Sequence, residues 1–398
     1  MRSTPTALFL LLPLALAAQT DKVDYDEGFL AAKTLFAERE AKAVAEPFKG
    51  ITTNGEVLPG LFPVKATGVS TAPLVAAATA FIASLTPEQK LHTVFGVDSP
   101  EWRRWCNVDN GIYTRQGTSL RAMSPPQIAA ARQLLLATLS TRGMALIDAI
   151  RRTDETLAEL NRDRLAYGED LYYFTVMGLP SPTKPWGWQI DGHHLVINVF
   201  VLGDQVVMTP TFLGGEPVHT TTGKYAGNAV LQEEQNGGLA LMQQFSPEQG
   251  AKATIAAAKL HPDNQAEAFK DNAVIPYAGL PVKTFSPAQR DQLVALIKLF
   301  IDHQEEGHAR VRMDEIVAHL DETWFAWVGG SDSNAVFYYR IHSPVVMIEF
   351  DHQVPIGTRM INTPGKVTRD HIHVVIRTPN GNDYGKDLLR QHLASQPH

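Results

Sequence analysis

The sequence predicts an α+β protein whose antiparallel or mixed sheet is built from two blocks of strands and packed with several amphipathic helices. Runs of alternating or β-branched apolar residues, typical of strands, gather in residues 171–209 and again in residues 324–377. Amphipathic helical patterns lie before and between these two blocks. Because strands and helices do not alternate regularly, the pattern favours α+β over a doubly wound sheet.

The N-terminus has the pattern of a secretory signal peptide over residues 1–18. Arg2 supplies a positive charge, Ala7–Leu16 is apolar, and Ala15-Leu16-Ala17 has the small-x-small form of a cleavage site. No later apolar run is long enough to predict a membrane span. We therefore expect a secreted or periplasmic protein with a single globular domain over residues 19–398.

The amino-acid composition disfavours two classes of binding partner. The chain has 35 basic and 42 acidic residues, a formal charge of -7. This mild acidity disfavours nucleic acid and anionic membranes as partners, which leaves a small-molecule ligand or substrate. Cys106 is the single cysteine, so no internal disulfide is possible, and we expect a buried, inert thiol rather than a nucleophile. The sequence does not predict an oligomeric state.

Four segments carry a common helix-start signal, in which a hydroxyl N-cap is followed by proline and, three residues after the cap, by glutamine. This arrangement predicts a capping box. The segments are Thr86–Gln89, Ser124–Gln127, Ser246–Gln249 and Ser286–Gln289. The helices expected from these signals and from periodicity are Asp26–Ala45, Ala72–Leu85, Gln127–Asn161 (broken near Gly143), Ala226–Gln244, Pro247–Leu260, Pro287–His303, Ala309–Leu320 and Tyr384–Leu393.

The expected strands fall into the two blocks. They are Leu171–Met177, His194–Leu202, Gln205–Thr209, Trp324–Val328, Ala335–Ile341, Pro344–His352 and His371–Arg377. Gly203-Asp204 predicts a two-residue hairpin turn, since glycine stands first as a type II′ turn prefers. The segments Gly178–Trp188, Gly214–Lys224 and His352–Asp370 are expected to be loops.

The strongest metal signal is the pair His371 and His373. Alternate side chains of a strand share a face, so both imidazoles point the same way and can bind one divalent ion. Glu349, which lies mid-strand among apolar residues, is the preferred carboxylate partner, as a ligand or as a general base. The alternative is that both histidines make only structural or solvent-facing hydrogen bonds.

His193 and His194 follow Gly192 and offer a third histidine ligand. Adjacent residues of a regular strand point to opposite faces, so one of the two joins the site while the other bonds elsewhere. The sequence does not choose between them.

Arg377 shares the face of His371 and His373, and Asp383 follows shortly after. Arg377 is a candidate to clamp an anionic substrate group in bidentate fashion. It is equally suited to a structural ion pair with Asp383 or Glu349. Asp383 is a candidate catalytic residue beside Glu349 and Arg377, and it is also placed to cap the final helix.

These motifs resemble the DUF3500 family, a family of exported proteins of unknown function. The resemblance runs from about Leu85 to His392, and the segments that carry it are Tyr173–Gly178, Trp186–Leu195, Thr209–Gly214, Ile348–Phe350 and His371–Gly385. It implies that the motif residues form one pocket, and it implies no activity. The residues concerned are His193, His194, Glu349, His371, His373, Arg377 and Asp383.

The sequence thus predicts a metal-dependent enzyme, with zinc, iron or copper bound by histidines, and hydrolysis of an extracytoplasmic small molecule as the favoured reaction. Two alternatives stay open. One is a binding protein that captures a metal or small ligand without turnover, and the other is a metal-dependent oxidoreductase.

Overall fold

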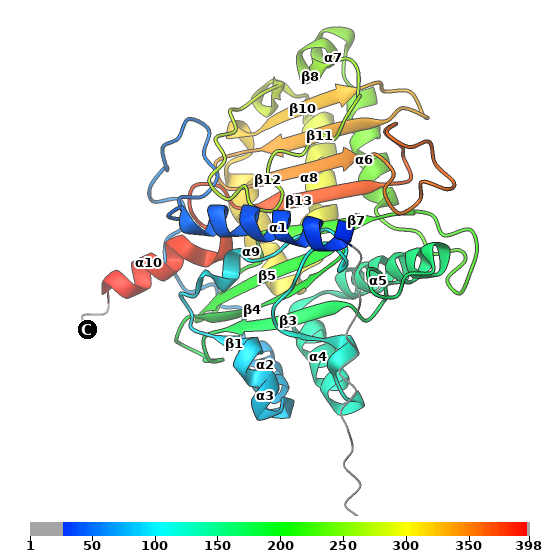
Figure 1. The fold of residues 1–398 in the computed structure, drawn as a ribbon. Helices are drawn as coiled ribbons and strands as arrows, with labels where there is room; N and C mark the ends of the chain where they lie inside the picture. Colours follow the sequence, from blue (N-terminus) through cyan, green and yellow to red (C-terminus); the bar gives the residue numbers. More distant parts are fainter. Residues whose placement is uncertain (1–26, 396–398) are drawn as a thin grey trace, which may run out of the picture.

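The computed structural model describes residues 27–395 and confirms the predicted α+β class (Figure 1). The predicted signal peptide lies outside the described residues. The strands are β1 (Val94–Phe95), β2 (Thr118–Ser119), β3 (Tyr172–Met177), β4 (Trp186–Gly192), β5 (Leu195–Leu202), β6 (Gln205–Val207), β7 (Thr211–Gly215), β8 (Thr254–Ala256), β9 (Leu280–Pro281), β10 (Trp324–Gly329), β11 (Phe337–His342), β12 (Met347–His352) and β13 (Ile372–Arg377). The α-helices are α1 (Glu27–Ala45), α2 (Ala72–Ser84), α3 (Pro87–Thr93), α4 (Pro125–Thr138), α5 (Thr141–Asn161), α6 (Gln232–Gln243), α7 (Pro247–Ala253), α8 (Pro287–Ile301), α9 (Glu306–Ala318) and α10 (Lys386–Ser395).

All these strands belong to one mixed sheet of two antiparallel blocks. The order along the sheet is β1-β3-β4-β5-β7-β13-β12-β11-β10-β8, with β2, β6 and β9 pairing at the side. The first block, β3 to β7, meets the second, β10 to β13, at the antiparallel pair of β7 and β13. Strand β7 also pairs with β5, so the seam between the blocks brings the start of β5 near the start of β13.

The two faces of the second block differ in character. Aromatic side chains stack on the face covered by α6, where the Tyr339 hydroxyl donates to the Glu234 carbonyl at 2.8 Å. The other face carries buried Glu349, Asp351 and Arg377, and the chain after β8 crosses it. Helix α1 lies across this polar face near β13 (Figure 1).

The four predicted helix starts begin α3, α4, α7 and α8. In each, the glutamine side chain accepts from the cap's backbone N–H, as in Thr86 at 3.0 Å and Ser124 at 2.8 Å. The long predicted helix is broken between α4 and α5, where Ser140 caps α5 through Gly143. The hairpin at Gly203-Asp204 is also confirmed, with Leu202 paired to Gln205.

Other predicted elements were wrong in part. The helix expected over Pro247–Leu260 stops at Ala253, because the chain turns there into the edge strand β8. The loop expected over Gly178–Trp188 contains the start of β4, and β7 was not predicted. Within residues 27–395 no helix is both long and apolar enough to cross a membrane.

Candidate metal centre

Three buried histidines meet at the seam between the two blocks of the sheet. His371 precedes β13, His373 lies in it, and His194 ends the two-residue turn between β4 and β5. Their Nε2 atoms lie 3.0 Å apart for His371–His373, 3.1 Å for His194–His371 and 3.3 Å for His194–His373. We call these three residues the histidine cluster. Within the described residues they are the one group of histidine, cysteine and acidic side chains with three or more ligand atoms within 4.8 Å of one another.

Backbone geometry brings His194 into the cluster. It has a left-handed φ of 59°, which turns its side chain across β7 towards β13. Gly214 of β7 stands beneath its ring, where a Cβ would lie 3.0 Å from the imidazole and 2.8 Å from the Ile372 carbonyl oxygen. A side chain at position 214 would therefore push the ring out of the cluster.

Acceptor groups fix the orientation of two of the rings. His371 Nδ1 lies 2.7 Å from the Val354 carbonyl oxygen, and His373 Nδ1 lies 3.1 Å from Glu267 Oε1. A carbonyl or carboxylate oxygen only accepts, so each Nδ1 carries the hydrogen. In a neutral imidazole the Nε2 atom then carries no hydrogen and has a free lone pair. A hydrogen-bond partner on the far nitrogen is the usual support of a histidine metal ligand.

Protonation of the cluster is opposed by its surroundings. Burial, with the charge of neighbouring histidines, holds the pKa of His194 well below its usual range, and burial lowers the pKa of His371 to about 4 despite nearby Glu216. Burial alone would raise the pKa of Glu267, but the hydrogen bond and charge of His373 outweigh it and the pKa is lowered. His194 and His371 are therefore neutral near pH 7, and the carboxylate that supports His373 is ionised.

When both rings are neutral, as histidine metal ligands are, two lone pairs face each other across 3.0 Å at His371 and His373. A hydrogen on His194 Nε2 can bridge to one of them and leaves the other opposed. A cation between the three nitrogens removes the repulsion. Zinc–nitrogen bonds of about 2.0–2.1 Å at tetrahedral angles place the nitrogens about 3.3 Å apart, close to the spacing of the cluster. The cluster is compatible with a metal ion held by three histidines.

His193 stands beside the cluster without pointing into it. Its ring stacks on that of His194 with centroids 3.9 Å apart, and its Nδ1 lies 2.6 Å from Asp154 Oδ1. Because His193 and His194 form a hairpin turn rather than a strand start, the two rings lie side by side. The structure thus brings His194, and not His193, together with His371 and His373.

Glu349 is not brought into the histidine cluster. Its fully buried carboxylate accepts from the Tyr338 hydroxyl at 2.7 Å and from the backbone N–H groups of Gln265 and Ala266, both at 2.9 Å. Burial raises its pKa, and these hydrogen bonds act in the other direction. Glu349 therefore holds the segment that carries Glu267, which in turn supports His373.

Arg377 and Asp383 lie in a separate buried set of charges with Arg103, Asp271 and Tyr384, here called the Asp271 network. Arg377 Nη1 lies 2.9 Å from Asp271 Oδ1 and 3.2 Å from Asp383 Oδ2. Its Nε and Nη2 donate to the carbonyl oxygens of Ala266 and Glu267. Arg377 is fully buried, and these partners use its donors, so the structure points it at the protein rather than at the cavity described below.

The Asp271 network also anchors α1. Arg103 Nε lies 2.8 Å from Asp271 Oδ2, and its other nitrogens donate to the carbonyl oxygens of Ala43, Val44 and Glu46 at the end of α1. Cationic donors at a helix C-terminus satisfy carbonyls that have no partner within the helix. One buried carboxylate thus connects α1, the segment before Asp271 and strand β13.

Glu267 and Glu216 were missed by the sequence analysis. Glu267 lies in an irregular segment with no periodic pattern, 106 positions before the histidine that it contacts. Glu216 accepts from the backbone N–H groups of Ile356, Gly357 and Thr358, and its Oε2 lies 3.6 Å from His371 Nδ1. The two glycines before Glu216 indicated only a loop, so no local signal marked either residue.

A cavity of about 660 Å³ opens beside His373. Its volume is in the range of small-molecule sites. Helix α1 forms one wall with Phe36, Arg39, Lys42 and Ala43, and the segment from Pro262 to Lys270 forms another. Cys106 also lines it, and burial raises the pKa of its thiol to about 12, as expected for an inert thiol.

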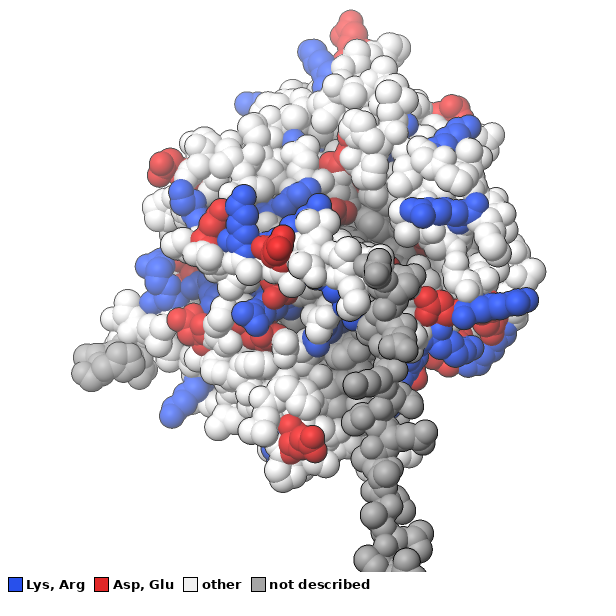
Figure 2. Space-filling model, viewed as in Figure 1, with Lys and Arg blue, Asp and Glu red and all other residues white. Residues whose placement is uncertain are grey.

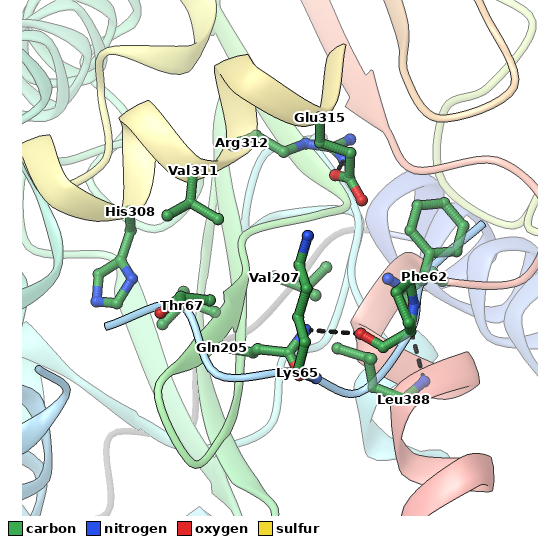
Figure 3. Close-up of a pocket in the computed structure, with 13 residues that line it drawn as sticks. Phe62, Lys65, Thr67, Gln205, Val207, His308, Val311, Arg312, Glu315 and Leu388 are labelled. Atoms are coloured by element: carbon green, nitrogen blue, oxygen red, sulfur yellow. Dashed lines mark hydrogen bonds and ion pairs between the residues drawn. The ribbon is translucent and has the colours of Figure 1, made fainter. Parts of the chain in front are cut away.

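A second cavity lies under α9 and is far smaller, about 60 Å³ (Figure 3). His308, Arg312 and Glu315 of α9 face the chain around Lys65 there. Arg312 already donates to the Val345 carbonyl oxygen and the Thr378 hydroxyl and pairs with Glu315. This cavity has room for a few water molecules, and its arginine is already used.

Comparison with known proteins identifies the family and no relative of known activity. The chain matches no curated protein and no solved structure. The family model described as "Protein of unknown function (DUF3500)" matches residues 67–386, and this range contains the histidine cluster, its supporting carboxylates and the Asp271 network. The chain therefore belongs to the DUF3500 family.

Proposed function

We propose that this protein is an exported metal-dependent enzyme with a mononuclear centre on His194, His371 and His373, and that it hydrolyses a small molecule. The observation that carries the proposal is the convergence of three buried Nε2 atoms within 3.3 Å, two of them with the opposite ring nitrogen on an acceptor. Three histidines plus water are one arrangement of catalytic zinc sites.

The donor set favours hydrolysis. Three neutral ligands leave the full charge of a divalent ion on the water that completes the coordination, and this lowers the pKa of that water towards ~7. A divalent ion held by the three histidines would in this way supply a nucleophile near neutral pH. His373 borders the 660 Å³ cavity, so a substrate bound there lies next to the metal. A fully ligated storage site would have no such open position.

The chain's own residues set the geometry. Glu267 and the Val354 carbonyl orient the two histidines of β13, and His193 supports His194 by stacking. Glu349 and Arg377 hold the segment that presents Glu267. These contacts fix the three nitrogens before the metal arrives, which lowers the cost of binding it.

Metal content tests the proposal. Purified protein without a His-tag is analysed by elemental mass spectrometry beside His371→Ala/His373→Ala and a control, His219→Ala/His319→Ala, which removes two histidines outside the cluster. We expect about one zinc, iron or copper ion per chain in the parent and the control, and none in the folded cluster variant. No metal in the parent after incubation with Zn²⁺, Fe²⁺, Cu²⁺ and Mn²⁺ would contradict the proposal.

Turnover separates an enzyme from a binding protein. The zinc-loaded parent is expected to hydrolyse an activated ester such as 4-nitrophenyl acetate, and a chelator or the cluster variant to abolish this activity. Bound metal without turnover would favour capture of a metal or ligand. If the bound metal is iron or copper, oxidation reactions are assayed instead, to test the oxidoreductase alternative.

Export belongs to the same proposal, with one domain following the leader. The pattern of residues 1–18 supports it. N-terminal sequencing of protein from the extracytoplasmic fraction is expected to begin after Ala17 or Ala18. A chain that retains Met1 and stays in the cytoplasm would contradict export.

A further inference from the structure

The cavity beside His373 has walls that differ in chemistry. Its apolar part consists of Phe36, Ala43, Val108, Pro262, Ala268 and Phe269. His373 and Glu267 lie at the end that meets the histidine cluster. Two phenylalanines in one cavity provide a surface for an aromatic or other apolar group.

Three cations line the same cavity: Arg39 and Lys42 from α1 and Lys270 from the facing segment. All three side chains are exposed, and within residues 27–395 no carboxylate lies within ion-pair distance of them. The Arg39 guanidinium lies 5.5 Å from the centre of the Phe36 ring, and Lys270 Nζ lies 3.2 Å from the Asn264 carbonyl oxygen. These contacts orient the two cations without an ion pair, although the charge of Lys270 also acts on Glu267.

The acidic groups of the cavity offset only part of this charge. Glu46 and Glu267 are its two carboxylates against the three cations, and Glu267 is bound to His373. A divalent ion on the histidine cluster would add two positive charges. Figure 2 shows Lys and Arg side chains gathered around α1, with acidic side chains among them. Clefts with an excess of one charge attract small ligands of the opposite charge.

Arg377, the arginine that the sequence suggested for an anionic substrate, is used by Asp271 and Asp383. Arg39 is suited to the role, because its guanidinium is exposed on the cavity wall and stacked on an aromatic ring. Lys42 lies three positions further along α1, so the two cations share one side of the helix.

We propose that the substrate is a small anion, a carboxylate or phosphate on an aromatic or apolar body, held by Arg39, Lys42 and Lys270 with its reactive group towards His373. This inference rests on the proposed function for the chemistry at the metal, but the cavity and its cations stand without it. The phenylalanine walls accept the apolar body, and the cations accept the anionic group.

Binding of matched probes tests the proposal. Benzoate and phenyl phosphate are the anionic probes, and benzamide is the neutral one of similar shape. Isothermal titration calorimetry is run on metal-loaded and metal-free protein, whose metal content is measured first. The variant Arg39→Glu/Lys42→Glu is compared with Lys252→Glu/Lys283→Glu, which changes the net charge equally at exposed positions outside the cavity lining.

We expect at least one anionic probe to bind at least about tenfold more tightly than benzamide. Arg39→Glu/Lys42→Glu is expected to weaken that binding about tenfold or more, and the control pair to change it less than about twofold. The anion that binds more tightly shows whether the substrate carries a carboxylate or a phosphate. Equal affinity for benzamide, equal effects of the two charge reversals, or no anion binding in the millimolar range would overturn the inference.

The results of the anion titrations can be judged separately from whether the protein binds a metal ion. A protein that holds stoichiometric metal and does not prefer the anions contradicts the substrate class and leaves the enzyme proposal standing. A protein without metal that still binds an anion through Arg39 and Lys42 supports the cavity inference and contradicts the metal-dependent function.

Discussion

The histidine cluster and the Asp271 network are both buried, both polar and both attached to β13, but they differ in whether their polar atoms are paired with oppositely charged protein groups. In the Asp271 network two arginines face two aspartates, and the remaining donors meet carbonyl oxygens. In the histidine cluster three Nε2 atoms converge within 3.3 Å, and they meet only one another. Buried polar groups are normally satisfied by protein partners. The Asp271 network follows that rule through ion pairs, whereas the histidine cluster has no charged partner at its Nε2 atoms and could hold a metal ion.

This difference separates structural residues from candidate functional residues in a protein whose family has no known function. Arg377 and Asp383 were candidate site residues in the sequence, but in the structure they pair with each other, and Arg377 also pairs with Asp271. His371 and His373 are also buried, but their Nε2 atoms face only each other and the Nε2 atom of His194. The predictions below test that division.

The largest effect is expected from Arg377→Met, which removes the centre of the Asp271 network. Asp271 and Asp383 would lose their shared partner in the interior, and breaking a buried pair in this way costs about 3–5 kcal/mol. Urea unfolding at pH 7 would measure the loss. Arg132→Met is the control, because Arg132 pairs with Asp148 at 3.3 Å on the surface and should cost less than about 1 kcal/mol. Equal losses would mean that the network is not structural. If Arg377→Met does not fold, Asp271→Asn provides the milder test.

Glu349→Gln is expected to destabilise the protein by about 1–3 kcal/mol. An amide places N–H donors against the backbone N–H groups of Gln265 and Ala266 or against the Tyr338 hydroxyl, and leaves buried donors unpaired. Thermal and urea unfolding would measure the change beside Glu322→Gln, whose carboxylate is exposed. A metal ligand would lose bound metal while the stability of the metal-free form stayed the same. That pattern would place Glu349 in the metal centre.

The sequence located the cluster well on one strand and poorly elsewhere, for physical reasons. The period of two in β13 places His371 and His373 on one face, and their rings do meet. The choice of His194 depends on its left-handed conformation in the turn between β4 and β5 and on Gly214 beneath its ring. The sequence predicted a strand start at His194 and did not predict β7, the strand that carries Gly214. Glu267 reaches His373 only through the contacts of its segment with Glu349, Asp351 and Arg377. Such contacts between distant positions leave no periodicity in a single sequence.

Glu267→Gln tests the histidine cluster, as Arg377→Met tests the Asp271 network. The carboxylate holds the hydrogen of His373 on Nδ1, so its loss should weaken metal binding by about 10- to 100-fold without removing a ligand. Competition with a chromophoric chelator would measure the affinity. Glu46→Gln is the matched control, because Glu46 lines the same cavity and pairs with no histidine of the cluster. Unchanged affinity in Glu267→Gln would mean that His373 is not a ligand or that its orientation is fixed by other contacts.

His342 provides the smallest and most specific test, since it is a buried histidine that belongs to neither group. Its ring lies 4.7 Å from that of Tyr277, and burial, with the charge of Arg340, lowers its pKa to about 3. Between about pH 6.5 and pH 3 the unfolded chain therefore binds a proton at this position and the folded protein does not. Protonation favours unfolding, so stability falls as the pH falls through this window, by at most about 1.4 kcal/mol per pH unit for one group.

His342→Phe keeps the ring contact and removes the titrating group. The slope of unfolding free energy against pH should therefore be smaller in this variant than in the parent, and urea unfolding from pH 6.5 to pH 4 would measure it. His219→Phe is the control, because His219 is exposed. The comparison is made on metal-free protein, so that release of a metal at low pH adds nothing to either slope. Equal slopes in the parent and His342→Phe would show that this histidine is already charged when folded. Burial without a partner would then not keep a histidine neutral in this protein, and the neutrality inferred for His194 and His371 would lose its physical basis.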